Sequence, residues 1–280
     1  MNAPVPPVDR GLTGIGEAEY EFIRQLVYEH SRINLGAEKK ALVAARVTKR
    51  LRALKLPDFD IYCQYLRSSK GRQETPLLVE AISTNHTQFF RESRHFDFLK
   101  NVIAPKWRAH GGCVRVWSAA GSSGEEPYTI AIVLAEALGL KSDWRILATD
   151  ISMRMLELGR SGIYYADRLT EMPPELQRRY FQRGVGASEG QYRVKEELRR
   201  RVDFVQLNLL QPNYPFATEF DLILCRNVMI YFDRETQQTL IGKITPHLMV
   251  GGFLMVGHSE SLNGIHHRLS VVEPAIYQKK

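Results

Sequence analysis

The sequence contains little cysteine and no long apolar run. Its three cysteines, Cys63, Cys113 and Cys225, lack the Cys-x-x-Cys spacing of zinc and redox sites, so we expect reduced thiols and no metal. No apolar run approaches the roughly 20 residues that a membrane-spanning helix needs. The first residues also lack the basic and apolar regions of a secretory signal. We therefore expect a cytoplasmic protein.

The composition is that of an ordinary globular protein. A chain of 280 residues, with 44% hydrophobic and 25% charged residues, is long enough for one large α/β domain and one small helical domain. The net charge of +7, from 38 basic and 31 acidic residues, permits a nucleic acid, a membrane surface or an acidic protein as partner. Charge alone does not choose among them, and the excess can also simply keep the surface solvated.

The first 84 residues divide into a tail, a helical domain and a linker. Residues 1–16 are rich in Pro and Gly and have no periodic apolar pattern, which indicates a mobile tail. Apolar residues at helical spacing predict a helical domain over 17–70. Its helix at about 37–56 carries basic residues on the faces beside its apolar stripe. The polar stretch through Thr75 indicates a linker, which we place at 71–84, and a helical connector is expected at about 76–108.

Strand-like runs alternate with helical segments through the domain expected over 85–280. This alternation predicts a mostly parallel, doubly wound α/β sheet, Rossmann-like in class. The last two runs, 252–259 and 271–278, are joined by a loop, which predicts an antiparallel edge hairpin typical of class I methyltransferases. A glycine-containing segment at about 177–200 predicts a small inserted β-subdomain. The other strands are expected at 114–120, 145–150, 202–210 and 221–228.

The end of the first strand predicts a nucleoside pocket, because ligands of doubly wound sheets bind beyond the carboxyl ends of the strands. Gly121 lets the backbone pass close beneath a ligand there. Glu125 and Glu126 then open a helix, and carboxylates at a helix start repel the pyrophosphate of a dinucleotide. S-adenosylmethionine instead brings an ammonium and a sulfonium, which Glu126 can attract. We therefore favour S-adenosylmethionine as the cofactor.

Residues at the ends of later strands complete this pocket. Asp150 is placed to accept hydrogen bonds from ribose hydroxyls, although a ribose acid alone fits either cofactor. Asn208 can pair with an adenine edge, and three further residues close the pocket: Cys225, Arg226 and Asn227. Each acidic residue alone is more simply explained as a helix cap or a surface charge. Together they predict a pocket.

Six motifs carry a resemblance to a known family: TNHTQFFRE (84–92), VWSAAGSSGEEPY (116–128), SGIY (161–164), QLNLL (206–210), CRNVMIYFD (225–233) and GHSESL (257–262). With them the chain resembles the chemotaxis receptor methyltransferase (CheR) family over nearly its full length after the tail. The resemblance implies a helical N-terminal domain joined to a class I methyltransferase domain with a small β-subdomain. It also implies methyl transfer from S-adenosylmethionine to glutamate side chains of bacterial chemoreceptors, with S-adenosylhomocysteine as product.

The resemblance assigns roles to residues of this chain. It implies Arg91 and Tyr231 as catalytic residues. The cofactor contacts that it implies are Asn85, Thr87, Arg91, Glu126, Asp150, Asn208, Leu209, Cys225 and Arg226, with Asn227 adjacent. A glutamate carboxylate, with a pKa near 4.3, is already anionic at neutral pH, so the reaction needs no general base. We expect Arg91 and Tyr231 to orient the carboxylate; the simpler alternatives are a structural ion pair and a core tyrosine.

The resemblance also implies two docking surfaces for chemoreceptors. The basic helix at 37–56, with Arg46, Lys49 and Arg50, is expected to contact the acidic receptor helices; the alternative is a plain solvated face. The hairpin around Gly184, Val185 and Gly186 resembles the loop that binds a C-terminal pentapeptide tether of some receptors, by adding a strand to its edge. The alternative is a hairpin that merely covers the sheet.

Two other functions remain open from the sequence. One is a methyltransferase for another acceptor, including nucleic acid, although the chain lacks an Asn-Pro-Pro-Tyr motif and an aromatic-rich basic groove. The other is a non-catalytic protein that keeps the fold only to dock on receptors. We expect neither nucleic-acid binding nor membrane insertion.

Overall fold

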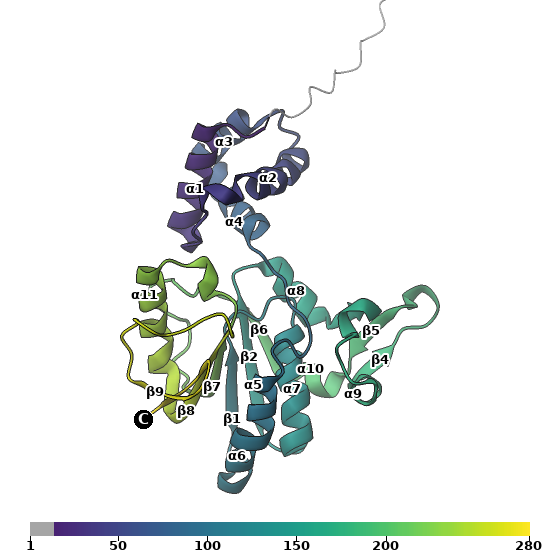
Figure 1. Ribbon diagram of the computed structural model, residues 1–280. Helices are drawn as coiled ribbons and strands as arrows, with labels where there is room; N and C mark the ends of the chain where they lie inside the picture. Colours follow the sequence, from purple (N-terminus) through teal and green to yellow (C-terminus); the bar gives the residue numbers. More distant parts are fainter. Residues whose placement is uncertain (1–13) are drawn as a thin grey trace, which may run out of the picture. The chain divides into compact units, whose positions relative to one another are not determined.

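The computed structural model describes residues 14–280, which form two compact units (Figure 1). The boundary between the units falls between Thr84 and Asn85. Of the predicted tail, residues 1–13 lie outside the described residues. Within residues 14–280, no helix is both long enough and apolar enough to cross a membrane.

Within residues 14–84, the N-terminal unit is a bundle of four α-helices and one 3-10 turn. They are α1 (Glu17–Ser31), η1 (Ala37–Lys39), α2 (Lys40–Leu54), α3 (Phe59–Arg67) and α4 (Gly71–Ile82). Asp58 caps α3 by accepting a hydrogen bond from the backbone N–H of Ile61 at 2.9 Å. Buried residues from the α-helices, including Ile23, Val43 and Leu78, form the core.

The predicted linker over 71–84 is wrong, because most of this stretch forms helix α4. Its polar sequence, RQETP, resembles a loop, but Glu74 and Thr75 are 2% and 4% exposed. Glu74 is buried as the partner of Arg50 and Tyr62, and Leu78 packs in the core. A tertiary ion pair therefore turns a polar stretch into a core helix.

The second unit contains a seven-stranded sheet in the order β6-β2-β1-β7-β8-β10-β9. Its first five strands are parallel, as the doubly wound prediction requires. The elements in chain order are α5 (Arg94–Phe98), η2 (Leu99–Ile103), α6 (Ala104–His110), β1 (Val114–Ser118), α7 (Glu125–Leu138), β2 (Trp144–Asp150), α8 (Met153–Ser161), β6 (Val202–Gln206), β7 (Phe220–Cys225), η5 (Met229–Tyr231), α11 (Arg234–Ile244), η6 (Thr245–His247), β8 (Leu248–Val256), β9 (Leu269–Glu273) and β10 (Ile276–Lys279).

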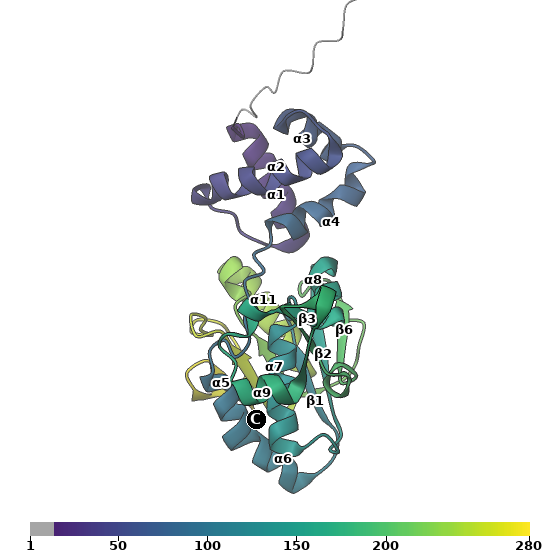
Figure 2. The same ribbon diagram turned by 90° about the vertical axis from the view of Figure 1, so that its right-hand side faces the viewer.

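Alternate residues of the central strands bury two separate cores. Val116 belongs to the core that also contains residues of α7, whereas Trp117 belongs to the core that contains residues of α11. This alternation is what a strand with both faces covered produces. Figure 1 shows α11 and α7 on opposite sides of the sheet, and Figure 2 shows α6 and α7 in front of the strands.

The C-terminal edge of the sheet is antiparallel, as predicted, but it contains one strand more than expected. Residues 271–278 were predicted as a single strand, yet the chain turns within them and forms β9 and β10. Ala275 adopts a left-handed conformation in this turn, with φ of 64°. β10 pairs antiparallel with β8, and β9 forms the edge. Pro274 is consistent with this turn, since proline donates no hydrogen bond to a strand ladder.

The β-subdomain is a three-stranded sheet in the order β3-β5-β4. The antiparallel pairing of β4 and β5 confirms the hairpin predicted at about 177–200. The third strand, β3, was not expected and pairs antiparallel with β5. The elements of this region are β3 (Ile163–Tyr165), η3 (Ala166–Leu169), α9 (Pro174–Tyr180), β4 (Phe181–Arg183), η4 (Gly186–Ser188), β5 (Gln191–Val194) and α10 (Glu196–Arg199).

Candidate cofactor and catalytic site

The strand order places the candidate site at the carboxyl ends of β1, β2, β6 and β7. The chain runs outward from β1 through β2 to β6, and then returns to the other side of β1 with β7 and β8. The order therefore reverses at β1, and such a switch point is where doubly wound sheets bind ligands. The strand ends there are Ser118, Asp150, Gln206 and Cys225.

The turn after β1 is tied to the end of β2. Gly121 donates its N–H to the carbonyl of Thr149 at 2.8 Å. A Cβ on Gly121 would lie 3.1 Å from Pro127 Cγ, which is tighter than ordinary van der Waals contact. The Asp150 carboxylate accepts the N–H groups of Ser122 and Ser152, both at 2.9 Å. The turn and the predicted ribose acid therefore form one fixed unit.

Glu126, in the first turn of α7, has a side chain that is 12% exposed and a carboxylate with two partners. The Ser118 hydroxyl donates to its Oε1 at 2.7 Å, and Arg226 donates to its Oε2 at 2.8 Å. Burial raises the pKa of the Glu126 carboxyl, and Arg226 opposes this effect by stabilising the anion. Glu125 beside it is fully buried and accepts a hydrogen bond from the Ser123 hydroxyl at 2.6 Å. Two carboxyl groups thus occupy the start of α7, which suits a cationic ligand and disfavours a pyrophosphate.

Arg226 joins the segments around Glu126 into one network, which we call the Arg226 network: Arg226, Glu126, Glu92 and Asn227. The Arg226 side chain is only 1% exposed. It donates to Glu92 Oε2 at 3.1 Å and to the backbone carbonyl of Arg91. Asn227 Nδ2 donates to the other Glu92 oxygen, also at 3.1 Å. The predicted pocket residues Glu126, Arg226 and Asn227 are therefore brought together.

Glu260 fixes the segment that leads to Tyr231. Its carboxylate accepts the N–H groups of Asn227 at 2.8 Å, Met229 at 2.8 Å and Gly257 at 2.6 Å. The pKa of Glu260 is raised by burial, although these N–H groups favour the anion. Among residues 14–280 we find no hydrogen-bond partner for the Tyr231 hydroxyl.

Sequence reasoning assigned no role to Glu92 or Glu260. Both lie in quoted motifs, Glu92 at the end of TNHTQFFRE and Glu260 within GHSESL. The motifs were therefore the available signal. A carboxylate that binds backbone N–H groups of a distant segment has no local pattern, so its role emerges only in the fold.

The segment 85–91 carries three predicted site residues. The Asn85 carbonyl accepts a hydrogen bond from the Ser122 hydroxyl at 3.5 Å, which brings this segment to the turn after β1. Thr87 is buried, and its carbonyl accepts from Arg168 at 3.0 Å. Arg91 is half-buried and donates to the His86 carbonyl at 2.9 Å.

The other predicted contacts lie after β6 and at the end of β7. Asn208 Oδ1 accepts the N–H of Leu210 at 2.9 Å and so shapes the loop after β6. Leu209 and Cys225 are buried in the core that contains residues of α11. Burial raises the pKa of the Cys225 thiol well above its usual value, so this thiol stays protonated at neutral pH.

Four non-glycine residues around the site adopt left-handed backbone conformations. Phe90, Glu92, Ser122 and Asn227 have φ of 57°, 58°, 47° and 55°. Such conformations cost free energy and persist only where surrounding contacts enforce them. Phe90 and Glu92 lie on the loop before α5, Ser122 on the turn after β1 and Asn227 on the loop after β7, so three loops around the Arg226 network have enforced backbone conformations.

The predicted docking residues have different environments. Arg50 makes two hydrogen bonds to the Glu74 carboxylate, at 2.8 and 2.7 Å, and Arg46 donates to the backbone carbonyls of Ile82 and Ser83. Both arginines thus support the helical unit itself. Lys49 is exposed. In the β-subdomain, Val185 is 83% exposed in the loop after β4.

The loop after β4 depends on its glycines. A Cβ on Gly184 would lie 2.1 Å from the Ser188 carbonyl oxygen. Gly186 has φ of 59°, which glycine adopts without strain. A larger residue at either glycine would therefore disturb the loop that carries Val185.

Comparison with known proteins identifies both units. Residues 85–277 match the family model for the CheR methyltransferase, SAM binding domain, and residues 18–83 match that for the CheR methyltransferase, all-alpha domain. The chain is 41% identical over 264 residues to the chemotaxis protein methyltransferase of Salmonella typhimurium, covering 94% of this chain and 90% of that protein. Its counterpart from Escherichia coli is 42% identical over 264 residues, covering 94% and 91%. Chemotaxis protein methyltransferase 2 of Pseudomonas aeruginosa is 41% identical over 260 residues, covering 92% of each chain.

Proposed function

The chain belongs to the CheR methyltransferase family, and we propose that it methylates glutamate side chains of bacterial chemoreceptors, giving glutamate methyl esters in the cytoplasm. The matched domain is an S-adenosylmethionine-binding domain. The observation that supports the proposal most strongly is the buried Glu126–Arg226–Glu92 arrangement at the switch point of the sheet. The carboxylates of Glu92 and Glu126 lie there, where a cationic cofactor would bind.

The site residues fit S-adenosylmethionine by their chemistry. Glu126 would hold its ammonium end, Asp150 its ribose hydroxyls and Asn208 its adenine. Gly121 allows close backbone approach. When bound, the cofactor supplies a methyl group on a positively charged sulfur. The remaining work of the protein is to position the acceptor and to exclude water.

Arg91 and Tyr231 are the proposed catalytic residues. The acceptor glutamate is already anionic, so the protein must orient its oxygen rather than remove a proton. The Arg91 guanidinium can bind one carboxylate oxygen by a charge-assisted hydrogen bond, and the Tyr231 hydroxyl can donate to it as well. Glu260 holds the backbone before Tyr231, and Arg226 holds the Arg91 carbonyl, so both residues start from fixed backbone.

Two surfaces are proposed for receptor docking. The exposed basic residues Lys49, Arg52 and Lys55 of α2 and its end can contact an acidic receptor helix. The edge of the β-subdomain at β4 can accept a C-terminal receptor pentapeptide as an added strand, with Gly184, Val185 and Gly186 beside it.

One experiment separates this function from its rivals. The protein is incubated with methyl-labelled S-adenosylmethionine and receptor-containing membranes, and the product is treated with alkali. A glutamate methyl ester releases volatile methanol, whereas a methyl group on nitrogen stays attached. A docking protein without activity transfers no label.

Variants then test the catalytic residues. Arg91→Ala should abolish methyl transfer while leaving the fold intact, because within residues 14–280 its guanidinium makes a single hydrogen bond, to a backbone carbonyl. Arg94→Ala, an exposed arginine at the start of α5, is the matched control. Near-normal turnover of Arg91→Ala would remove Arg91 from the mechanism.

Calorimetry tests the tether. Pentapeptides with aromatic residues and a free C-terminal carboxylate are titrated into the protein, and we expect saturable binding. Val185→Asp should weaken it, whereas Val272→Asp, an exposed valine on β9, should not. Absence of heat at high peptide concentration would contradict tether binding.

A further inference from the structure

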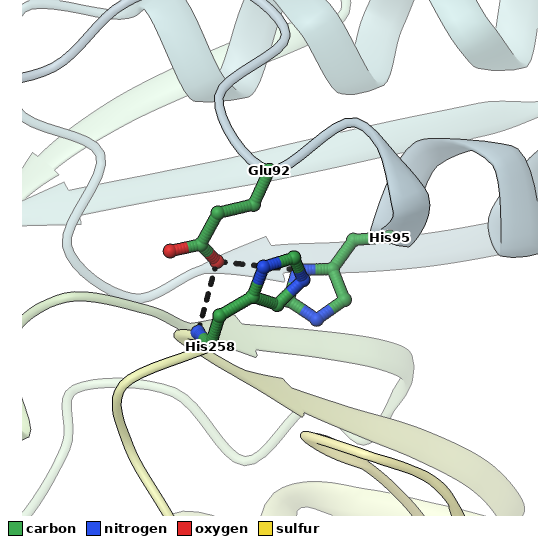
Figure 3. Close-up of side chains that lie close together, drawn as sticks. All are labelled: Glu92, His95 and His258. Carbon is green, nitrogen blue, oxygen red and sulfur yellow. Dashed lines mark hydrogen bonds and ion pairs between the residues drawn. The ribbon is translucent and has the colours of Figure 1, made fainter.

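Glu92, His95 and His258 bring three potential metal ligands together (Figure 3). One ligand atom from each lies within 4.8 Å of the others, and Glu92 Oε2 is 3.6 Å from His95 Nδ1. The ring centroids of the two histidines are 4.7 Å apart. The residues come from the loop before α5, from α5 and from the loop after β8. Glu92 and His258 are 166 residues apart in the sequence.

The His95 side chain is buried without any hydrogen bond to its ring nitrogens among the described residues. It is 1% exposed. Buried polar atoms in native proteins almost always have such a partner. An imidazole nitrogen that carries no proton offers its lone pair to a metal.

The charges around this cluster leave room for a cation. Glu92 and Glu126 share the single positive charge of Arg226. The hydrogen bonds from Arg226 and from the His258 N–H to Glu92 Oε2 are both 3.1 Å, at the long end of the usual range. A cation on Glu92 can replace the Arg226 contact, since Arg226 keeps Glu126 at 2.8 Å and the Arg91 carbonyl.

We propose that Glu92, His95 and His258 form a binding site for a divalent transition-metal ion of the zinc type. Two imidazole nitrogens and one carboxylate oxygen are a donor set that Zn²⁺ accepts, with a fourth position left for water. Metal–ligand bonds of about 2.0–2.1 Å separate tetrahedral ligand atoms by about 3.3 Å. The distance of 3.6 Å between Glu92 and His95 needs only a small adjustment. The exposed His258 ring can rotate to close the remaining distance.

Isothermal calorimetry with Zn²⁺ tests this site directly. The full-length protein is used with the substitution Cys113→Ser, which removes the exposed thiol as a competing zinc ligand. We expect one saturable site per chain. His258→Ala should weaken Zn²⁺ binding by at least about tenfold, since loss of even a supporting residue typically costs that much. His110→Ala, an exposed histidine on α6, is the control and should leave the affinity unchanged.

A second measurement reports the ligand set. Co²⁺ in place of Zn²⁺ should give the visible absorption of a tetrahedral nitrogen and oxygen site, without a sulfur charge-transfer band, and His258→Ala should remove it. Glu92→Gln should weaken binding as well, with the melting temperature recorded to show that the variant is folded. Absence of binding by the parent protein, or equal affinity in His258→Ala, would overturn the proposal. The readout is metal binding, so it is independent of the proposed methyl transfer.

Discussion

Each unit of the protein contains an ion pair between an arginine and a glutamate. The two pairs differ in how many groups share the arginine's hydrogen bonds. In the helical unit, Arg50 makes two hydrogen bonds to Glu74, and the Tyr62 hydroxyl donates a third at 2.9 Å. In the second unit, Arg226 divides its donors among Glu126, Glu92 and a backbone carbonyl. The first network is a closed pair, whereas the second is branched.

The branched network also leaves polar atoms without partners. Among residues 14–280, every buried side-chain nitrogen or oxygen that lacks a hydrogen bond belongs to the second unit, and Arg226 Nε and both His95 nitrogens are among them. The closed pair leaves none. Unsatisfied buried groups cost stability, so a fold tolerates them where a ligand will use them. The Arg50–Glu74 pair is thus satisfied within the helical unit, whereas the region of the Arg226 network keeps buried polar atoms without hydrogen bonds among the described residues.

The largest effect is expected from Arg226→Met. Breaking a buried ion pair costs about 3–5 kcal/mol, and the upper end applies because Arg226 is 1% exposed and leaves two carboxylates unpaired. Alkylation of the buried Cys225, followed by mass spectrometry, measures unfolding of this unit. A loss below about 1 kcal/mol would show that the network is not essential to the fold.

Glu74→Gln should cost somewhat less and should act in the helical unit alone. We expect a loss of about 3 kcal/mol, because the Arg50 side chain is 21% exposed and water can solvate it in part. Alkylation of the buried Cys63 should accelerate, while that of Cys225 should not. Glu80→Gln on the same helix is the control. Equal acceleration at both thiols would mean that the units do not unfold separately.

Glu126→Gln should affect the cofactor more than the fold. Loss of a charge-assisted hydrogen bond of about 1.5–3 kcal/mol corresponds to about tenfold to hundredfold weaker S-adenosylmethionine binding, measured by calorimetry. Because burial raises the Glu126 pKa, the carboxyl of the wild-type protein gains its proton at a higher pH than an ordinary glutamate. Wild-type affinity should therefore fall as the pH falls, while the affinity of Glu126→Gln stays flat. An equally steep pH dependence in the variant would assign the titration to another group.

The smallest effect is expected from Lys49→Glu. The exposed side chain of Lys49 has no hydrogen bond or ion pair among residues 14–280, so the free energy of unfolding should change by less than about 0.5 kcal/mol. At low salt, receptor methylation by Lys49→Glu should be severalfold slower than by the wild type, and at high salt this difference should disappear. The reason is that charges at the exposed edge of an interface act mainly on the association rate. Arg50→Glu should instead unfold the helical unit and cannot serve as a docking test. Unchanged methylation by Lys49→Glu would contradict docking through α2.

Much of the fold and of the site follows from local patterns. The alternation of strand-like and helical runs predicted the doubly wound sheet because each buried strand and each amphipathic helix shows its own periodicity. The glycine turn with Glu126 and the end of β2 at Asp150 were likewise visible as strand-end residues. The start of helix α4 was missed, because its polar residues Glu74 and Thr75 look solvent-exposed until Arg50 and Tyr62 are placed beside them.

The order of the elements and the family motifs can be read from the sequence, since they depend on residues close together in the chain. The pairing of charges across long separations is visible only in the folded protein. Arg226 meets Glu126 at a separation of 100 residues, and Glu92 meets the backbone of His258 at a separation of 166. The physical reason is that a buried charge must find its partner in space, and no local pattern encodes a contact made only when the sheet closes.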